Sequence, residues 1–67
     1  MNGEIKDVVV DRGFGFIRDG NGVEWFFHRT DVKPHKNDFQ GLRARDRVTF
    51  EPSHNEKGPK AANVRKV

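Results

Sequence analysis

The fold of this chain is decided by residues 12–18, whose sequence is RGFGFIR. Phe14 and Phe16 lie two residues apart, so both rings project from the same face of an extended strand. Gly15 and Ile17 occupy the opposite face. Arginines at both ends of the segment are an unusual setting for two rings in a dry core. The segment therefore raises the question of which of its faces is buried.

Short segments that alternate apolar and polar residues recur along the chain, which is typical of half-buried strands rather than helices. Residues 19–22 (DGNG) predict a tight hairpin, because Asp, Asn and Gly tolerate positive φ. A single helical turn is expected next, capped by Thr30 or Asp31 and ended by Pro34. Residues 52–59 are expected to form a loop. The strands are predicted at residues 5–10, 14–19, 23–28, 47–51 and 60–67.

The number and order of these strands indicate the architecture. Five short antiparallel strands in 67 residues, three of them in a meander before a long crossover, predict an all-β closed barrel. We expect one domain over residues 1–67 and favour a five-stranded antiparallel OB-fold barrel, with an SH3-like barrel as the alternative. The chain has no cysteine, so neither a disulfide nor a thiolate metal site can support it.

Charge and hydropathy limit the partners. The net charge is +3, and the basic excess lies in residues 32–67, whereas residues 1–31 are slightly acidic. A basic protein of this size suits a polyanionic partner, although a charged surface also serves solubility alone. No apolar run approaches the roughly 20 residues that span a bilayer, so we expect a cytoplasmic protein with no membrane partner.

The third predicted strand answers the question about the faces. Trp25, Phe27 and Val23 share one of its faces, and Phe26 and His28 share the other. The first set is purely apolar and is predicted to be buried, whereas the second includes an ionisable ring and is predicted to be exposed. The other core residues expected are Ile5, Ile17, Val48 and Phe50, with Phe39, Leu42 and Val64 as further inward contacts.

Pairing of the second and third strands would place four aromatic side chains together on the outer face: Phe14, Phe16, Phe26 and His28, which we call the aromatic platform. Such an exposed patch risks aggregation unless it has a ligand. Unpaired bases are a suitable ligand, since each base–aromatic stack is worth about 1–3 kcal/mol and every base has a π-face. The cations expected to meet phosphates are Arg12, Arg18, Arg29 and Lys57. The alternative is that the phenylalanines of residues 12–18 belong to the core and the glycines form bulges.

These segments together resemble the bacterial cold shock protein family, whose members consist of a single cold shock domain. Residues 12–17 (RGFGFI) are similar to the family's first ribonucleoprotein motif, and residues 25–30 (WFFHRT) are similar to its second. Residues 57–64 (KGPKAANV) resemble its closing hairpin and last strand. The resemblance extends along the whole chain in the right order.

The resemblance implies an OB barrel that binds single-stranded RNA and DNA with low sequence specificity, often at pyrimidine-rich segments. It also implies an RNA chaperone that melts weak RNA structure, and a transcription antiterminator or regulator in the cold-shock response. The base-stacking residues that it implies are Phe14, Phe16, Phe26, His28 and Phe39. The basic contacts that it implies are Lys6, Lys57 and Arg12, the last at a position where the family usually has lysine.

Three positions depart from the family pattern. Asp7 stands where the family usually has a surface tryptophan, Val8 where it has a phenylalanine, and Arg29 where it has a third aromatic. The losses predict weaker stacking and more reliance on charge. Arg29 is the expected substitute, since a guanidinium both stacks on a base and pairs with phosphate. A monomer is expected, and the longer loop over residues 33–39 would permit a strand-swapped dimer.

Other classes of function fit the sequence less well. His28, His35 and His54 are scattered, and no Ser or Cys nucleophile lies near His28 in the sequence, so we predict that the protein is not an enzyme. No metal, cofactor or small-molecule substrate is expected. The alternative is an SH3-like interaction module whose phenylalanine patch docks a peptide. Grooves of that type favour Tyr and Trp with acidic rims, whereas this chain has no Tyr and its patch is bordered by basic residues.

Overall fold

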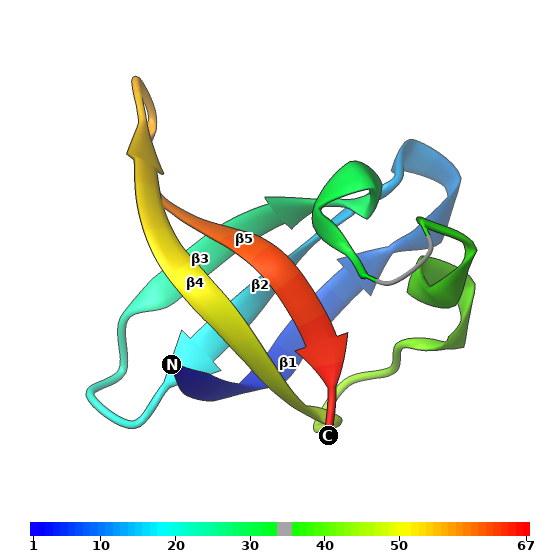
Figure 1. Ribbon diagram of the computed structural model, residues 1–67, viewed down its shortest axis with the longest axis horizontal. Helices are drawn as coiled ribbons and strands as arrows, with labels where there is room; N and C mark the ends of the chain where they lie inside the picture. The colour runs from blue at the N-terminus through cyan, green and yellow to red at the C-terminus, as the bar shows by residue number, and fades with distance from the viewer. Residues whose placement is uncertain (34–35) are drawn as a thin grey trace.

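The protein forms a closed five-stranded barrel (Figure 1) in a computed structural model that describes residues 1–33 and 36–67, without the side chains of residues 36 and 37. The strands are β1 (Asn2–Val9), β2 (Phe14–Asp19), β3 (Glu24–His28), β4 (Arg47–Asn55) and β5 (Gly58–Lys66). Three 3₁₀ turns connect them: η1 (Val10–Arg12), η2 (Arg29–Asp31) and η3 (Lys36–Gly41). The all-β OB barrel predicted from the sequence is confirmed.

Strand direction determines how the barrel closes. The order around the barrel is β1-β2-β3-β5-β4, and β4 pairs antiparallel with β1. Because β1, β3 and β5 then run in one direction, the last junction is parallel, and it is made through Phe26 and Lys60. The sequence-based expectation of antiparallel strands holds for the other four pairs but not for this one.

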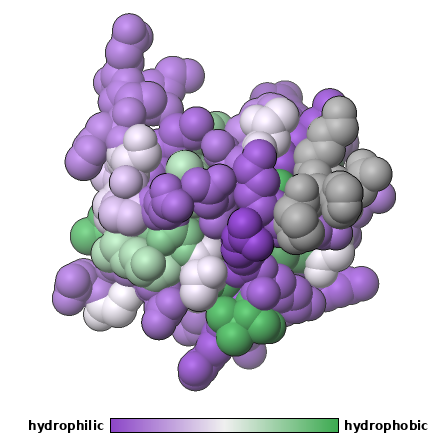
Figure 2. Space-filling view, viewed as in Figure 1, coloured by the Kyte–Doolittle hydropathy of each residue, from purple (hydrophilic) through white to green (hydrophobic). Residues whose placement is uncertain are grey.

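The hairpin of β4 and β5 is longer than the sequence indicates. Residues 52–55 and 58–59, expected in a loop, continue the ladder through Pro52↔Ala61 to Asn55↔Gly58. Residues 51–57 are exposed, so no apolar alternation marks them as strand. The hairpin projects from the upper left of the barrel in Figure 1, and the same arm is hydrophilic in Figure 2. Its length places Lys57 away from the barrel wall.

The core follows the predicted strand faces with one exception. Val23 is 40% exposed, because it lies in the connection before β3 begins at Glu24 and is outside the strand alternation. Phe39 and Leu42 are buried as expected for anchors of the crossover. The buried apolar residues are Ile5, Ile17, Trp25, Phe27, Val32, Phe39, Leu42, Val48, Phe50, Ala61 and Val64.

A buried carboxylate joins the β2–β3 hairpin to the core. Asp19, 7% exposed, accepts a hydrogen bond from Trp25 Nε1 at 2.9 Å through Oδ2. Its Oδ1 accepts from the backbone N–H groups of Asn21 at 2.8 Å and Val23 at 3.0 Å. The Trp25 hydrogen bond, with those of the turn, lowers the pKa of the Asp19 carboxyl, although burial acts in the opposite direction. The Asp19 carboxylate, which can only accept hydrogen bonds, therefore satisfies the three donors of Asn21, Val23 and Trp25.

The two glycines of residues 12–18 are required for different reasons. A Cβ atom at Gly15 would lie 2.6 Å from the carbonyl oxygen of Asp7 and 2.8 Å from the ring of Phe27. Gly13 has a φ of 73°, a left-handed conformation that L side chains rarely adopt. Gly15 thus makes space for Phe27, and Gly13 allows η1 to turn the chain into β2.

We predict that Gly15→Ala lowers the free energy of unfolding by about 1–3 kcal/mol, because a methyl group there must displace a carbonyl oxygen and a buried ring. Gly20→Ala is the matched control, since a Cβ at Gly20 meets nothing within 4 Å. Urea unfolding followed by Trp25 fluorescence measures both. Equal unfolding free energies for the two variants would contradict the role assigned to Gly15.

The depressed pKa of Asp19 also predicts an acid-dependent stability. A carboxyl whose pKa is lower in the folded state stabilises the fold above its ordinary pKa of about 3.9, and the contribution is lost as pH falls through the folded-state pKa. Asp19→Asn is expected to lower Tm at neutral pH, because its NH₂ group must face an N–H donor. The variant should also lose less stability than the native protein between about pH 5 and pH 2. Thermal unfolding across this pH range tests both effects, and parallel pH profiles would contradict the assignment.

Candidate nucleic-acid interface

Three phenylalanine rings form a cluster on the outer face of β2 and β3. Their centroids are separated by 6.1 Å (Phe14–Phe16), 5.7 Å (Phe14–Phe26) and 5.8 Å (Phe16–Phe26). Interplanar angles of 86°, 34° and 68° indicate edge-to-face and tilted packing. All three side chains are only partly buried. The structure therefore brings the predicted phenylalanines together on the surface.

The strand register explains why these rings lie outside the barrel. Phe16 pairs with Phe26 across β2 and β3, whereas Gly15 pairs with Phe27 and Ile17 with Trp25. Cross-strand partners project to the same side of a sheet. Since Ile17, Trp25 and Phe27 are buried, the alternate positions must face outward. The interpretation of Phe14 and Phe16 as ordinary core residues is wrong for this reason.

His28 lies at one end of the platform, where it pairs with Phe14 and also begins η2. Its Nδ1 accepts a hydrogen bond from the backbone N–H of Thr30 at 3.3 Å, and its own backbone N–H donates to Asp31 Oδ2 at 3.0 Å. His28 is therefore the cap of this turn, which corrects the expected cap at Thr30 or Asp31. The predicted end of the turn at Pro34 lies outside the described residues. These bonds fix the orientation of the imidazole ring at the position opposite Phe14.

Two of the predicted cations share one carboxylate. Lys6 Nζ lies 2.8 Å from Glu24 Oε2, and Arg18 Nη2 lies 3.5 Å from the same atom. The hydrogen bond from Lys6, with that from Arg18, lowers the pKa of the Glu24 carboxyl against the opposing effect of burial. Sequence reasoning missed Glu24, because only the β2–β3 pairing shows that it lies across from Arg18. Lys6 and Arg18 are thus partly neutralised beside the platform.

Three other predicted cations are exposed and form no ion pair with the described residues: Arg12, Arg29 and Lys57. Arg29 lies close to the platform, since its Cδ atom is 3.2 Å from the position of a Cβ at Gly13 and its backbone N–H donates to Gly13 at 2.8 Å. Arg12 ends η1 and is separated from β2 by Gly13, and Lys57 is in the turn of the β4–β5 hairpin. Arg29 therefore packs on Gly13, and it forms no ion pair with the described residues.

Lys60 is a neighbour of the platform that sequence reasoning did not identify. It pairs with Phe26 at the parallel junction, and its Nζ lies 3.3 Å from Asp31 Oδ1. No local pattern distinguishes it from the other lysines of the last strand. Its place beside Phe26 follows only from closure of the barrel.

Phe39 is not part of the exposed patch. It is 2% exposed in η3, and its ring packs against Phe27 with a centroid separation of 5.9 Å. Its predicted role as a stacking residue is corrected on this ground, because a ring enclosed in the core has no free face for a base. The expectation that it anchors the crossover is confirmed.

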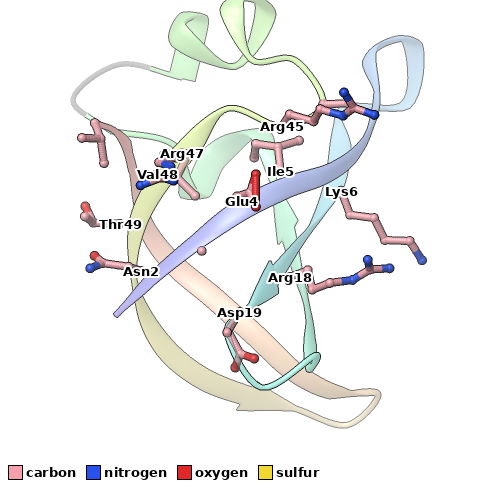
Figure 3. A pocket seen from close by; sticks show the side chains of 14 residues that line it. Asn2, Glu4, Ile5, Lys6, Arg18, Asp19, Arg45, Arg47, Val48 and Thr49 are labelled. Carbon is pink, nitrogen blue, oxygen red and sulfur yellow. The ribbon is translucent and has the colours of Figure 1, made fainter.

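A separate groove of about 940 Å³ lies over β1 and β4 (Figure 3). Its lining includes Lys6, Arg18, Arg45 and Arg47, and Glu4 lies among them. Its lining contains no aromatic side chain among the described residues. The groove thus offers charges of both signs but no surface for stacking, which separates it from the platform.

The fold and the site together define a class of protein. A closed OB barrel with a partly exposed aromatic cluster on its central strands, bordered by arginine and lysine, has the combination with which OB-folds bind single-stranded nucleic acid.

Comparison with known proteins identifies the family. The model of the 'Cold-shock' DNA-binding domain matches residues 1–67. Cold shock protein 1 of Lactiplantibacillus plantarum is 35% identical over 94% of this chain and 92% of its own length. Cold shock-like protein CspG of Escherichia coli is 37% identical over 96% of this chain and 90% of its own length. The chain belongs to the cold shock domain family, whose members bind nucleic acid.

A solved structure supports the same assignment. Drosophila Unr CSD456 aligns with a TM-score of 0.72 and 25% identity over 98% of this chain, which corresponds to 26% of that longer chain. Among the residues that the structure describes, no helix is long and apolar enough to cross a membrane. The same residues contain no group of three or more His, Asp or Glu side chains placed to hold a metal ion.

Phe16→Ala is expected to weaken binding of single-stranded oligonucleotides by about 5- to 150-fold, since one base–aromatic stack is worth about 1–3 kcal/mol. Val23→Ala is the control, because Val23 is an exposed apolar residue beyond the opposite end of β3 from His28. Anisotropy of a labelled heptathymidine measures both affinities. Equal affinities would show that bases do not stack on this ring.

Proposed function

We propose that this protein binds single-stranded RNA and DNA by stacking bases on Phe14, Phe16, Phe26 and His28. The observation that supports this most directly is the three-ring cluster on the outer face of β2 and β3. Stacking on rings needs no particular base, so sequence specificity is low. Resemblance to the family adds a preference for pyrimidine-rich segments.

Electrostatics is the second part of the proposal. Arg29 replaces an aromatic residue of the family pattern and lies against Gly13, where its guanidinium is free to stack on a base and to pair with phosphate. Arg12 and Lys57 are likewise unpaired among the described residues, whereas Lys6 and Arg18 share Glu24. The strongest phosphate contacts are therefore assigned to Arg12, Arg29 and Lys57.

The cellular role that follows is that of a cytoplasmic RNA chaperone. A protein that stacks on unpaired bases with low specificity favours the single-stranded state of RNA and so melts weak structure. By the same means it would act as a transcription antiterminator or regulator in the cold-shock response. We propose that it acts as a monomer and without a cofactor or catalytic activity.

The alternative remains a protein-interaction module in which the platform docks a peptide. Titration with heptathymidine at low salt separates the two, followed by NMR shifts of Phe14, Phe16 and Phe26. Trp25 is a poor reporter of contact, because its ring is buried against Phe50 with a centroid separation of 5.5 Å. Shifts confined to the platform support the proposal, and no response favours peptide docking.

Salt dependence tests the assignment of Arg29. For single strands, log K falls with log salt at a slope of about −0.7 per phosphate neutralised. Arg29→Ala is expected to reduce this slope in magnitude by about 0.7 and to weaken binding at low salt. The measurement is the binding constant for heptathymidine at four or more salt concentrations.

Arg47→Ala is the matched control for this experiment, since it removes an exposed arginine from the groove over β1 and β4. Its slope should equal that of the native protein. If Arg29→Ala leaves the slope unchanged, or if both variants change it equally, the guanidinium of Arg29 does not contact phosphate.

A further inference from the structure

A β-bulge in β1 places an acidic side chain beside the platform. Ile5 pairs with Ile17 and Asp7 with Phe16, so the register shifts by one residue between them. Without the shift Asp7 would oppose Gly15 and face inward, because side chains alternate along a strand. The extra residue moves Asp7 to the outer face and places Val8 opposite Gly15.

Asp7 consequently belongs to the same row as two platform rings. The row runs across four strands through Asp7, Phe16, Phe26 and Lys60. Directly opposed residues have Cβ atoms about 4.5–5.5 Å apart, so the Asp7 side chain is within reach of a base stacked on the ring of Phe16. A base stacked on Phe16 would present one edge to the Asp7 carboxylate.

The carboxylate of Asp7 has no counter-ion among the described residues. It is exposed and forms no hydrogen bond or ion pair with them. Lys6, the neighbour of Asp7 in the sequence, already forms an ion pair with Glu24 at 2.8 Å. Lys60, the cation in the same row, forms an ion pair with Asp31 at 3.3 Å. The acceptor capacity of Asp7 is therefore available to a ligand.

The chemistry of the base edges decides which ligand suits it. An ionised carboxylate only accepts hydrogen bonds. Guanine offers two adjacent donors on its Watson–Crick edge, N1–H and the exocyclic N2 amino group, and cytosine and adenine each offer an amino group. Thymine and uracil offer a single N3–H between two carbonyl oxygens, which an adjacent carboxylate repels.

We propose that Asp7 is a specificity-determining residue that selects, at the position stacked on Phe16, a base with an exocyclic amino group, guanine above all. The inference rests on the proposed function, since it requires a base on the platform. It adds a preference at one nucleotide within a footprint that is otherwise tolerant of sequence. A good hydrogen-bonded contact between a carboxylate or amide side chain and a base edge favours the matching base over a wrong one by about fivefold or more in affinity.

The test uses heptathymidine in which one guanine or one hypoxanthine replaces thymine at each position in turn. The two bases differ only by the 2-amino group. We expect the native protein to bind guanine at least about fivefold more tightly than hypoxanthine at one position or two adjacent positions. Asp7→Ala should abolish this ratio, and an unchanged NMR spectrum of the core residues confirms its fold.

Asp11→Asn is the matched control, because it removes the same charge from the neighbouring η1 turn and is expected to keep the ratio. A native ratio near one at every position overturns the proposal. So does a ratio that survives in Asp7→Ala, or a variant that gains affinity for all oligonucleotides equally, which would reduce Asp7 to a repulsive charge. Failure of the native protein to bind any oligonucleotide at low salt overturns the proposed function and this inference together.

Discussion

The site depends on the contact between Gly15 and the ring of Phe27. No Cβ atom fits at Gly15, because the Phe27 ring and the Asp7 carbonyl oxygen occupy that space. Phe27 therefore fills the barrel interior next to β2, and the adjacent residues of both strands must turn their rings outward. The exposed phenylalanines and the buried core are thus two consequences of one packing arrangement.

Strand register then decides what surrounds the rings. A single extra residue in β1 exchanges the faces of Asp7 and Val8, so a carboxylate lies outside and an apolar side chain packs on the core. At the far side of the sheet the parallel junction brings Lys60 against Phe26. The platform consequently has an acidic neighbour at one edge and a basic one at the other, an asymmetry that suits recognition of base edges as well as of phosphate.

Ion pairing distributes the charge unevenly around the platform. Glu24 and Asp31 engage Lys6, Arg18 and Lys60, whereas Arg29 stays unpaired among the described residues and lies over Gly13. A cation that lies 2.8–3.5 Å from a carboxylate offers less net charge to a phosphate than a cation without such a partner. The net charge of +3 therefore says less about binding than which of the described cations near the platform form no ion pair.

Alternation of side chains in residues 12–18 and 25–28 was enough to predict the buried Trp25 and Phe27 and the outward phenylalanines, and the number and order of the short strands predicted the all-β barrel. These features are local, since a strand's period of two assigns each residue to a face. The exposure of Val23, the cap at His28, the Glu24 ion pairs and the neighbours of Phe16 and Phe26 were decided only by tertiary structure. Each depends on a turn, on the bulge or on barrel closure, which bring together residues far apart in the chain, and no local period encodes such distances.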